Sequence, residues 1–320
     1  METDFWIMRP FNALFVSMFS AFLLLLILAS VALRKKTEKT RQMVLVTTCV
    51  ITLIGFIVYK LFLSRDSDYN VITASMGGFN WWGELPLQLC NINMLLIPLA
   101  VLKKDRSLMF FCFFLGPLGA MMALILPGNG FEGYSLLLPR MLGYYGTHFM
   151  IVIEGLALVA FGLFRPRLRD LPRAVLTALG ITFAVFLLNL FLRWSGLHPK
   201  ANYFFSVETE GNVLLELFYR WIPFPFLYLM PSLVILGVYM LVITVPFECA
   251  DRKKKRIDNG MNQYRRSPPV KQKQSAAVFQ CGQICLFCCN KELPVIIYFA
   301  QRSTEAWYFK SNPFGTALGR

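Results

Sequence analysis

Long apolar runs alternate with short polar connections along most of this sequence. The runs are Asn12–Leu33, Gln42–Leu63, Leu85–Leu102, Ser107–Leu126, Met141–Phe164, Pro172–Leu192 and Phe224–Phe247. A helix needs about 20 predominantly apolar residues to cross the hydrocarbon core of a bilayer. We therefore expect an all-α fold, a polytopic membrane bundle of seven transmembrane helices that forms one domain over residues 1–250.

Lysine and arginine are distributed unevenly between the two sets of connections. Twelve of them lie in the connections Arg34–Arg41, Lys103–Arg106 and Arg165–Arg173. The other set holds six over longer segments, namely Arg9, Arg65, Arg140, Arg193, Lys200 and Arg220. Cytoplasmic connections carry the excess of positive charge. We therefore expect a multi-pass protein of the cell membrane with its N-terminus outside and its C-terminus in the cytoplasm.

The composition supports a membrane location and narrows the function classes. The chain is 56% hydrophobic and 16% charged, with a mean hydropathy of +0.54, whereas soluble domains have about 45–50% apolar and about 25% charged residues. The net charge of +14 indicates no nucleic-acid partner, because the basic residues lie between the runs and after the last one. The sequence has no Gly-rich phosphate loop and no HExxH motif, so we expect no cofactor and no metal in the bundle.

The last segment, residues 251–320, differs in character from the rest. Its first part, 251–275, is basic, contains Pro and Gln, and lacks helical periodicity. We expect a disordered cytoplasmic tail. A cysteine cluster follows at Cys281, Cys285, Cys288 and Cys289, which would suit a metal or palmitate; we favour a tail without a function of its own.

The third apolar run carries a concentration of polar side chains in its first half. These are Gln88, Cys90, Asn91 and Asn93. Polar groups are rare in hydrocarbon unless they face a partner or a cavity. On a helix, Asn93 lies three residues after Cys90 and shares its face. The pattern therefore predicts a site here, with a polar neighbour beside the thiol.

A histidine on a distant run is predicted to meet this cysteine. The third and fifth runs both lead inward, and a helix rises about 1.5 Å per residue. By that measure Cys90 lies roughly 8 Å and His148 roughly 11 Å below the outer ends of their helices. An imidazole beside a thiol is a recurrent nucleophile arrangement. Alternatively, the thiol is only a small residue at a helix contact and the histidine donates to a neighbouring carbonyl.

Several other polar residues are candidates for supporting roles. Asn93 is expected to polarise an acyl carbonyl, because it shares the Cys90 face. Asn189 is expected either to orient His148 or to be a satisfied hydrogen bonder between helices. Asn202 and Tyr203, in the long outer connection, are expected either to form part of a lid over whatever the bundle holds or to stabilise the loop itself. Glu154 lies deeper and on another face than His148, so it is not expected to complete a triad.

Three short motifs resemble a known family. Residues 84–92, ELPLQLCNI, residues 144–148, YYGTH, and residues 202–205, NYFF, are similar to the YwaF-like integral membrane family, which is related to the transmembrane protein 164 acyltransferases. The resemblance covers about residues 10–247 and leaves the tail unmatched. It implies a membrane-embedded acyltransferase that remodels ether phospholipids by passing a fatty acyl chain through a cysteine.

The resemblance also implies which residues carry the chemistry. The family's cysteine falls on Cys90 and its histidine on His148. Many bacterial members have a second histidine two residues before the cysteine, and here Gln88 stands in that place. A glutamine cannot act as a base, so Gln88 is left with a hydrogen-bonding role. The implied partners are membrane phospholipids and lysophospholipids.

Two other functions remain open at this stage. Distant relatives hydrolyse fatty-acid esters with a threonine nucleophile, and a lipid esterase would share the first half of the reaction. A non-enzymatic transporter or receptor would instead show further ionisable residues along a path to the inner face. Glu154 is the only such residue that we identify within the runs.

Overall fold

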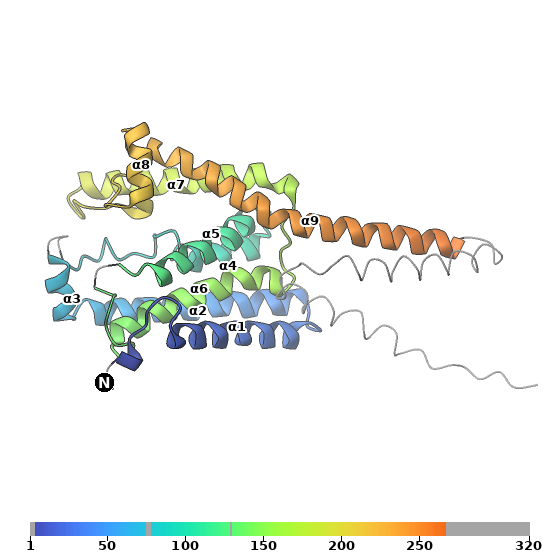
Figure 1. The fold of residues 1–320 in the computed structure, drawn as a ribbon, viewed down its shortest axis with the longest axis horizontal. Coiled ribbons are helices and arrows are strands. Elements are labelled where there is room, and N and C mark those ends of the chain that lie inside the picture. Colours follow the sequence, from blue (N-terminus) through green and yellow to red (C-terminus); the bar gives the residue numbers. More distant parts are fainter. Residues whose placement is uncertain (1–3, 75–77, 129, 267–320) are drawn as a thin grey trace, which may run out of the picture. The chain divides into compact units, whose positions relative to one another are not determined.

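The computed structural model describes residues 4–74, 78–128 and 130–266, and in these ranges the regular structure is helical. Six of its helices are long and apolar enough to cross a membrane, and Figure 1 shows the first five of them running side by side. The six are α1 (Ala13–Leu33), α2 (Glu38–Leu63), α5 (Arg106–Ile125), α6 (Pro139–Ala160), α7 (Leu171–Trp194) and α9 (Met230–Arg266). The prediction of an all-α membrane bundle is confirmed.

Short helices fill the connections. They are α3 (Ser67–Ile72), α4 (Asn93–Lys103) and α8 (Val213–Trp221), with single 3-10 turns at Asp4–Trp6, Leu168–Asp170, Tyr203–Phe205 and Leu227–Leu229. Side-chain caps fix several helix starts: Asn12 accepts from Phe15 N and Asp105 from Leu108 N. Such caps satisfy backbone N–H groups that have no partner within the helix. Five of the predicted spans begin and end close to their expected limits.

Large apolar side chains stay exposed on the outer faces of the long helices. On α1, Leu24, Leu25 and Leu28 are 55%, 60% and 56% exposed. Contiguous exposed apolar surface of this kind marks contact with a membrane or a partner. Together with the six membrane-length helices, it shows a multi-pass membrane protein.

The predicted third span is where the structure departs most from expectation. A continuous helix was expected over Leu85–Leu102, but α4 begins only at Asn93, and its 11 residues cover about half the hydrocarbon thickness. Residues 85–92 form turns instead. Pro86 biases the residue before it away from helical geometry. The expectation of a seventh full-length helix is thus corrected to a short helix entered through an irregular segment.

Ion pairs at the two ends of α2 show how the chain returns to the start of α5. Lys60 Nζ, near the end of α2, lies 2.5 Å from Glu84 Oε2, whereas Glu38, at its start, lies 2.8 Å from Lys104 Nζ. Residues 84–104 therefore run back along α2, first as turns and then as α4. The same end holds the pair Arg106–Asp170 at 2.6 Å. The three basic connections thus lie at one end of the bundle, as the expected orientation requires.

The chain divides into two units, residues 1–248 and 249–320, and α9 begins in the first and ends in the second. Residues 251–266 are helical, which differs from the disorder expected over 251–275. A helix that has already formed extends at little cost through Lys and Arg, which are good helix formers. Residues 267–275 and the cysteine cluster at 281–289 lie outside the described residues.

Candidate active site

Cys90 and His148 meet inside the bundle. The thiol Sγ lies 3.5 Å from His148 Nε2, and the two residues are 8% and 7% exposed. Cys90 belongs to the turns before α4, and His148 lies in the middle of α6. The two groups therefore come together as expected, although Cys90 is not on a helix as the depth argument assumed. Gly119 of α5 packs closely against the cysteine, because a Cβ there would lie 3.4 Å from Cys90 N.

The hydrogen bond of His148 Nδ1 determines whether Nε2 carries a proton. His148 Nδ1 lies 2.7 Å from the backbone oxygen of Tyr144, one turn earlier on α6. A carbonyl oxygen only accepts, so Nδ1 carries the proton and Nε2 keeps its lone pair toward the thiol. The histidine thus donates to a neighbouring carbonyl and faces the cysteine at the same time. An imidazole in this state is able to accept a proton at Nε2.

The ring of Tyr144 packs beside this imidazole. The two ring centroids are 4.4 Å apart, and Tyr144 stacks on Phe131 on its other side at 4.3 Å. The Tyr144 hydroxyl donates to Ala123 O at 2.8 Å. Packing and hydrogen bonding therefore hold both the carbonyl and the ring that position His148. Sequence reasoning did not single out Tyr144 as a support; its place four residues before the histidine is the available signal.

Asn93 braces the turn that carries the thiol. Its Nδ2 donates to Leu89 O at 2.8 Å and to Cys90 O at 3.1 Å. Both amide hydrogens are therefore engaged, and Asn93 offers none to an acyl carbonyl. The expected role in polarising the carbonyl is corrected to a positioning role. Asn91 Oδ1 lies 3.6 Å from Sγ and accepts from the thiol at the limit of such a contact.

Replacing Asn93 with alanine should loosen the Cys90 turn. The change leaves Leu89 O without its side-chain donor and removes one of the two donors of Cys90 O, which keeps the backbone N–H of residue 93, at a cost of about 1–3 kcal/mol. We expect faster alkylation of Cys90 by N-ethylmaleimide in membranes, followed by peptide mass spectrometry. The control Asn212→Ala, which removes the cap of α8 far from this turn along the chain, should leave that rate unchanged. Equal rates in wild type and Asn93→Ala would contradict the bracing role.

Lys60 is a functional candidate that sequence reasoning missed. It lies within the second apolar run, is 8% exposed, and its ammonium pairs with Glu84 Oε2. The Tyr69 hydroxyl donates to Glu84 Oε1 at 3.1 Å. Lys60 is close enough to interact electrostatically with both Cys90 and His148. An ionisable residue inside an apolar run was the available signal, so Glu154 is not the only such residue.

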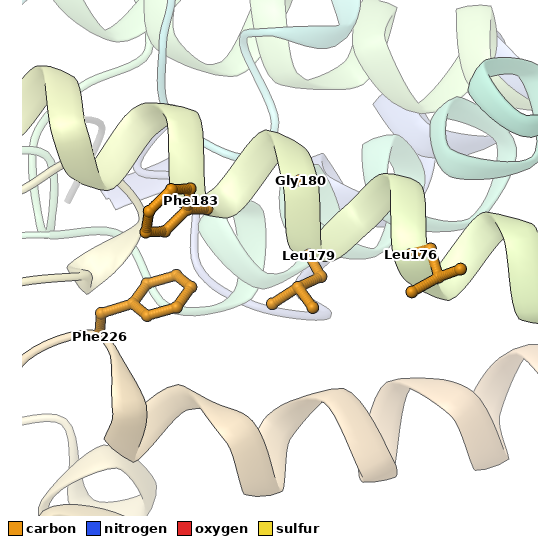
Figure 2. A pocket seen from close by; sticks show the side chains of 5 residues that line it. All are labelled: Leu176, Leu179, Gly180, Phe183 and Phe226. Atoms are coloured by element: carbon orange, nitrogen blue, oxygen red, sulfur yellow. The ribbon is translucent and has the colours of Figure 1, made fainter.

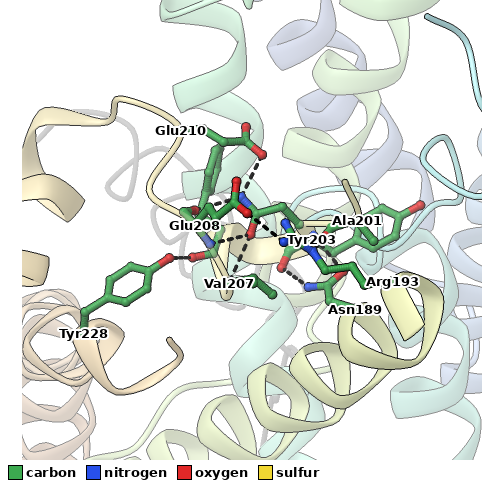
Figure 3. A network of polar contacts seen from close by, with 10 residues as sticks. Asn189, Arg193, Ala201, Tyr203, Val207, Glu208, Glu210 and Tyr228 are labelled. Carbon is green, nitrogen blue, oxygen red and sulfur yellow. Dashed lines mark hydrogen bonds and ion pairs between the residues drawn. The ribbon is translucent and has the colours of Figure 1, made fainter. Parts of the chain in front are cut away.

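Asn189 holds the outer loop and not the histidine. Its Nδ2 lies 2.8 Å from both Tyr203 O and Ser206 Oγ, and its Oδ1 accepts from Tyr203 N at 2.9 Å. Figure 3 shows Asn189 bonded to Tyr203 within the loop network. The expectation that Asn189 orients His148 is therefore corrected. The alternative of a satisfied hydrogen bonder describes it, with a loop as the partner.

Asn202 is fully engaged inside the same loop. Its Oδ1 accepts from the backbone of Val207 and Glu208, and its Nδ2 donates to Glu208 O and Glu210 Oε1. Burial raises the pKa of the Glu210 carboxyl, and the Asn202 hydrogen bond opposes that rise. These contacts give Asn202 a role in the loop structure. It has no free polar atom for a headgroup in this conformation.

Tyr203 and Gln88 join this loop to the segment that carries Cys90. The Tyr203 hydroxyl donates to Trp82 O at 2.5 Å and accepts from Leu85 N at 3.1 Å. Gln88 Oε1 accepts from Phe204 N at 3.4 Å. The outer connection is thus fastened to the turns before α4 on the stretch just ahead of the thiol. Gln88 acts by hydrogen bonding, as expected from its chemistry.

Glu154 lies apart from the cysteine and histidine. It is fully buried, and the hydroxyl of Thr52 on α2 donates to its Oε1 at 2.5 Å. It makes no hydrogen bond to His148, as expected. Within residues 4–74, 78–128 and 130–266, no three side chains of the types His, Cys, Asp and Glu gather as a metal site would require.

An apolar groove of about 300 Å³ lies between α7 and the segment that leads into α9 (Figure 2). It is lined by Leu176, Leu179, Gly180, Phe183 and Phe226. The rings of Phe183 and Phe226 lie together at one end, with centroids 5.3 Å apart. A wall made only of apolar side chains suits a hydrocarbon chain.

Comparison with known proteins gives one match. The model of the TMEM164 family matches residues 7–244, which is most of the chain and includes both Cys90 and His148. No curated protein and no solved structure matches.

Proposed function

Because the chain belongs to the TMEM164 family, we propose that it is a membrane-embedded acyltransferase that remodels phospholipids, ether phospholipids included. The observation that carries the proposal is the buried contact of 3.5 Å between Cys90 Sγ and His148 Nε2. His148 Nδ1 is engaged by Tyr144 O, so Nε2 is the nitrogen available to the thiol. The partners are a phospholipid as acyl donor and a lysophospholipid as acceptor.

The first half of the reaction forms a thioester on Cys90. His148 Nε2 takes the thiol proton, and the thiolate attacks the ester carbonyl of the donor phospholipid. The ester C–O bond breaks as the S–C bond forms, and the imidazolium gives its proton to the departing lysophospholipid oxygen. Lys60 supports this step because its ammonium, close to Cys90, stabilises the thiolate.

The second half transfers the acyl group to the acceptor. His148 takes the proton of a lysophospholipid hydroxyl, whose oxygen attacks the thioester carbonyl. The S–C bond breaks, and the thiolate recovers the proton from His148. Because Cys90 is 8% exposed and His148 7% exposed, water has poor access to the thioester. This burial favours a lipid acceptor over hydrolysis.

The proposal is tested by trapping the intermediate. The purified chain in lipid nanodiscs is given phosphatidylcholine with an isotopically labelled acyl chain, and peptide mass spectrometry locates the label. We expect a hydroxylamine-sensitive adduct on Cys90 that disappears on addition of lysophospholipid, with the label in new phospholipid. Release as free fatty acid would indicate the esterase. No adduct, together with solute flux across vesicles containing the chain, would indicate the transporter.

A further inference from the structure

Arg140 is a cation buried at the start of α6. It follows Pro139 at the first turn of this helix, and it is 2% exposed. Sequence reasoning placed it in an outer connection, where an arginine is normally solvated. Its Nη1 donates to both carboxylate oxygens of Asp66, at 2.8 and 2.9 Å. Its guanidinium carbon lies 4.2 Å from the centre of the Tyr134 ring.

One edge of this guanidinium has no acceptor among the described residues. Arg140 Nε and Nη2 are buried and without a hydrogen-bond partner there, although Nη1 is fully engaged. These two nitrogens present parallel N–H groups, which is the fork that binds phosphate or carboxylate in a bidentate way. Buried donors in native proteins are almost always satisfied. This edge therefore has the chemistry of an anion-binding site.

Tyr59 carries a second buried donor without a partner in the described ranges. The Tyr59 hydroxyl is buried and likewise has no partner within the described part of the chain. The Tyr59 ring packs against α6 one turn after Arg140, because a Cβ on Gly143 would lie 2.4 Å from it. The start of α6 adds the positive end of its helix dipole, which favours an anion.

We propose that the Nε and Nη2 edge of Arg140, with the Tyr59 hydroxyl, binds the phosphate of a phospholipid headgroup. This proposal rests on the proposed function, and it identifies the subsite that selects the phospholipid substrate. Arg140 precedes His148 by eight residues, or about 12 Å along α6. A phospholipid lying along α6 has its phosphate at the bundle end and its acyl ester deeper, in the same order as Arg140 and His148.

Wild-type protein tests this subsite by competition. The competitors are dialkyl phosphatidylcholine, which has no ester to react, and dialkylglycerol with the same chains. Loss of charge-assisted hydrogen bonds is worth roughly 10- to 100-fold in affinity. We expect the phosphatidylcholine to inhibit thioester formation on Cys90 at roughly 10- to 100-fold lower concentration than the dialkylglycerol. Equal inhibition would overturn the proposal.

A thermal-shift experiment tests the same subsite without any acyl chemistry. In Cys90→Ala protein, dialkyl phosphatidylcholine should raise the melting temperature, and Arg140→Lys, which loses the fork but keeps the charge, should reduce that shift. Arg220→Lys on the exposed face of α8 is the matched control and should retain it. An unchanged shift in Arg140→Lys, or an equal shift with inorganic phosphate alone, overturns the headgroup assignment. If Cys90 never forms a thioester, the proposed function fails while the shift still decides the subsite.

Discussion

Replacing Cys90 with alanine is expected to abolish thioester formation and acyl transfer in protein that stays folded in the membrane. Alanine removes Sγ, the only atom in the proposal that bonds to the acyl carbon. The remaining rate should be that of the uncatalysed exchange, because His148 alone has no nucleophile to activate. The measurement is transfer of a labelled acyl chain from phosphatidylcholine to lysophospholipid in nanodiscs.

Cys112→Ala is the matched control for this loss. Cys112 is equally buried, on α5, and has no hydrogen bond to a histidine. The same atoms are removed, so any general cost of deleting a buried thiol appears in both variants. Cys112→Ala should therefore retain activity. Full transfer by Cys90→Ala would remove the proposed nucleophile, whatever the control shows.

Replacing His148 should change how the rate of thioester formation depends on pH. His148→Gln should lower the rate of thioester formation by roughly 10²–10⁴ at neutral pH, because a glutamine cannot accept the thiol proton. The residual rate should then rise about tenfold per pH unit, since solvent hydroxide must generate the thiolate. Wild type should lack this steep rise at neutral pH. A parallel profile in both proteins would show that His148 is only structural.

The sequence predicted the long helices well because hydropathy and length report directly on membrane crossing. The prediction failed at Leu85–Leu102. The high average hydrophobicity of this stretch does not reveal that its backbone forms turns first and a helix only from Asn93. Pro86 and the polar residues after it favour turns. Asn93, close by in the chain, donates to Leu89 O, whereas two residues of the outer loop complete the contacts: Tyr203 accepts from Leu85 N, and Phe204 N donates to Gln88 Oε1. Those partners come from contacts that no local pattern contains.

The contact between Cys90 and His148 was predictable from the sequence, and the contacts around it were not. Cys90 and His148 were matched by depth along two helices, but Cys90 precedes α4, which begins at Asn93, so helical rise does not set its depth. The supporting contacts depend on tertiary structure. Asn189 bonds to a loop, and His148 is held by a carbonyl of its own helix. Lys60 was overlooked because charges were counted outside the apolar runs.

At Gly155 of α6, the smallest possible substitution should disturb the fold strongly. An added Cβ would lie 2.6 Å from Cδ and Cγ of Pro117 and 3.2 Å from Cys112 O, both on α5. Proline has a rigid ring and the carbonyl belongs to the backbone, so neither can turn aside. Gly155→Ala therefore requires α5 and α6 to separate, and we expect a destabilisation of about 1–3 kcal/mol or more.

This substitution should also reduce activity, because α5 and α6 hold the two halves of the site. Gly119 on α5 contacts Cys90, and His148 lies on α6, so separating the helices moves Sγ from Nε2. Gly146→Ala on α6 is the control: a Cβ there meets nothing within 4 Å, and alanine should stabilise the helix by roughly 0.5–1 kcal/mol. Scanning fluorimetry and thioester formation, measured on both variants, should separate them: Gly155→Ala should lose stability and activity, and Gly146→Ala should not. Similar behaviour of the two would mean that the α5–α6 contact does not set the distance between the thiol and the imidazole.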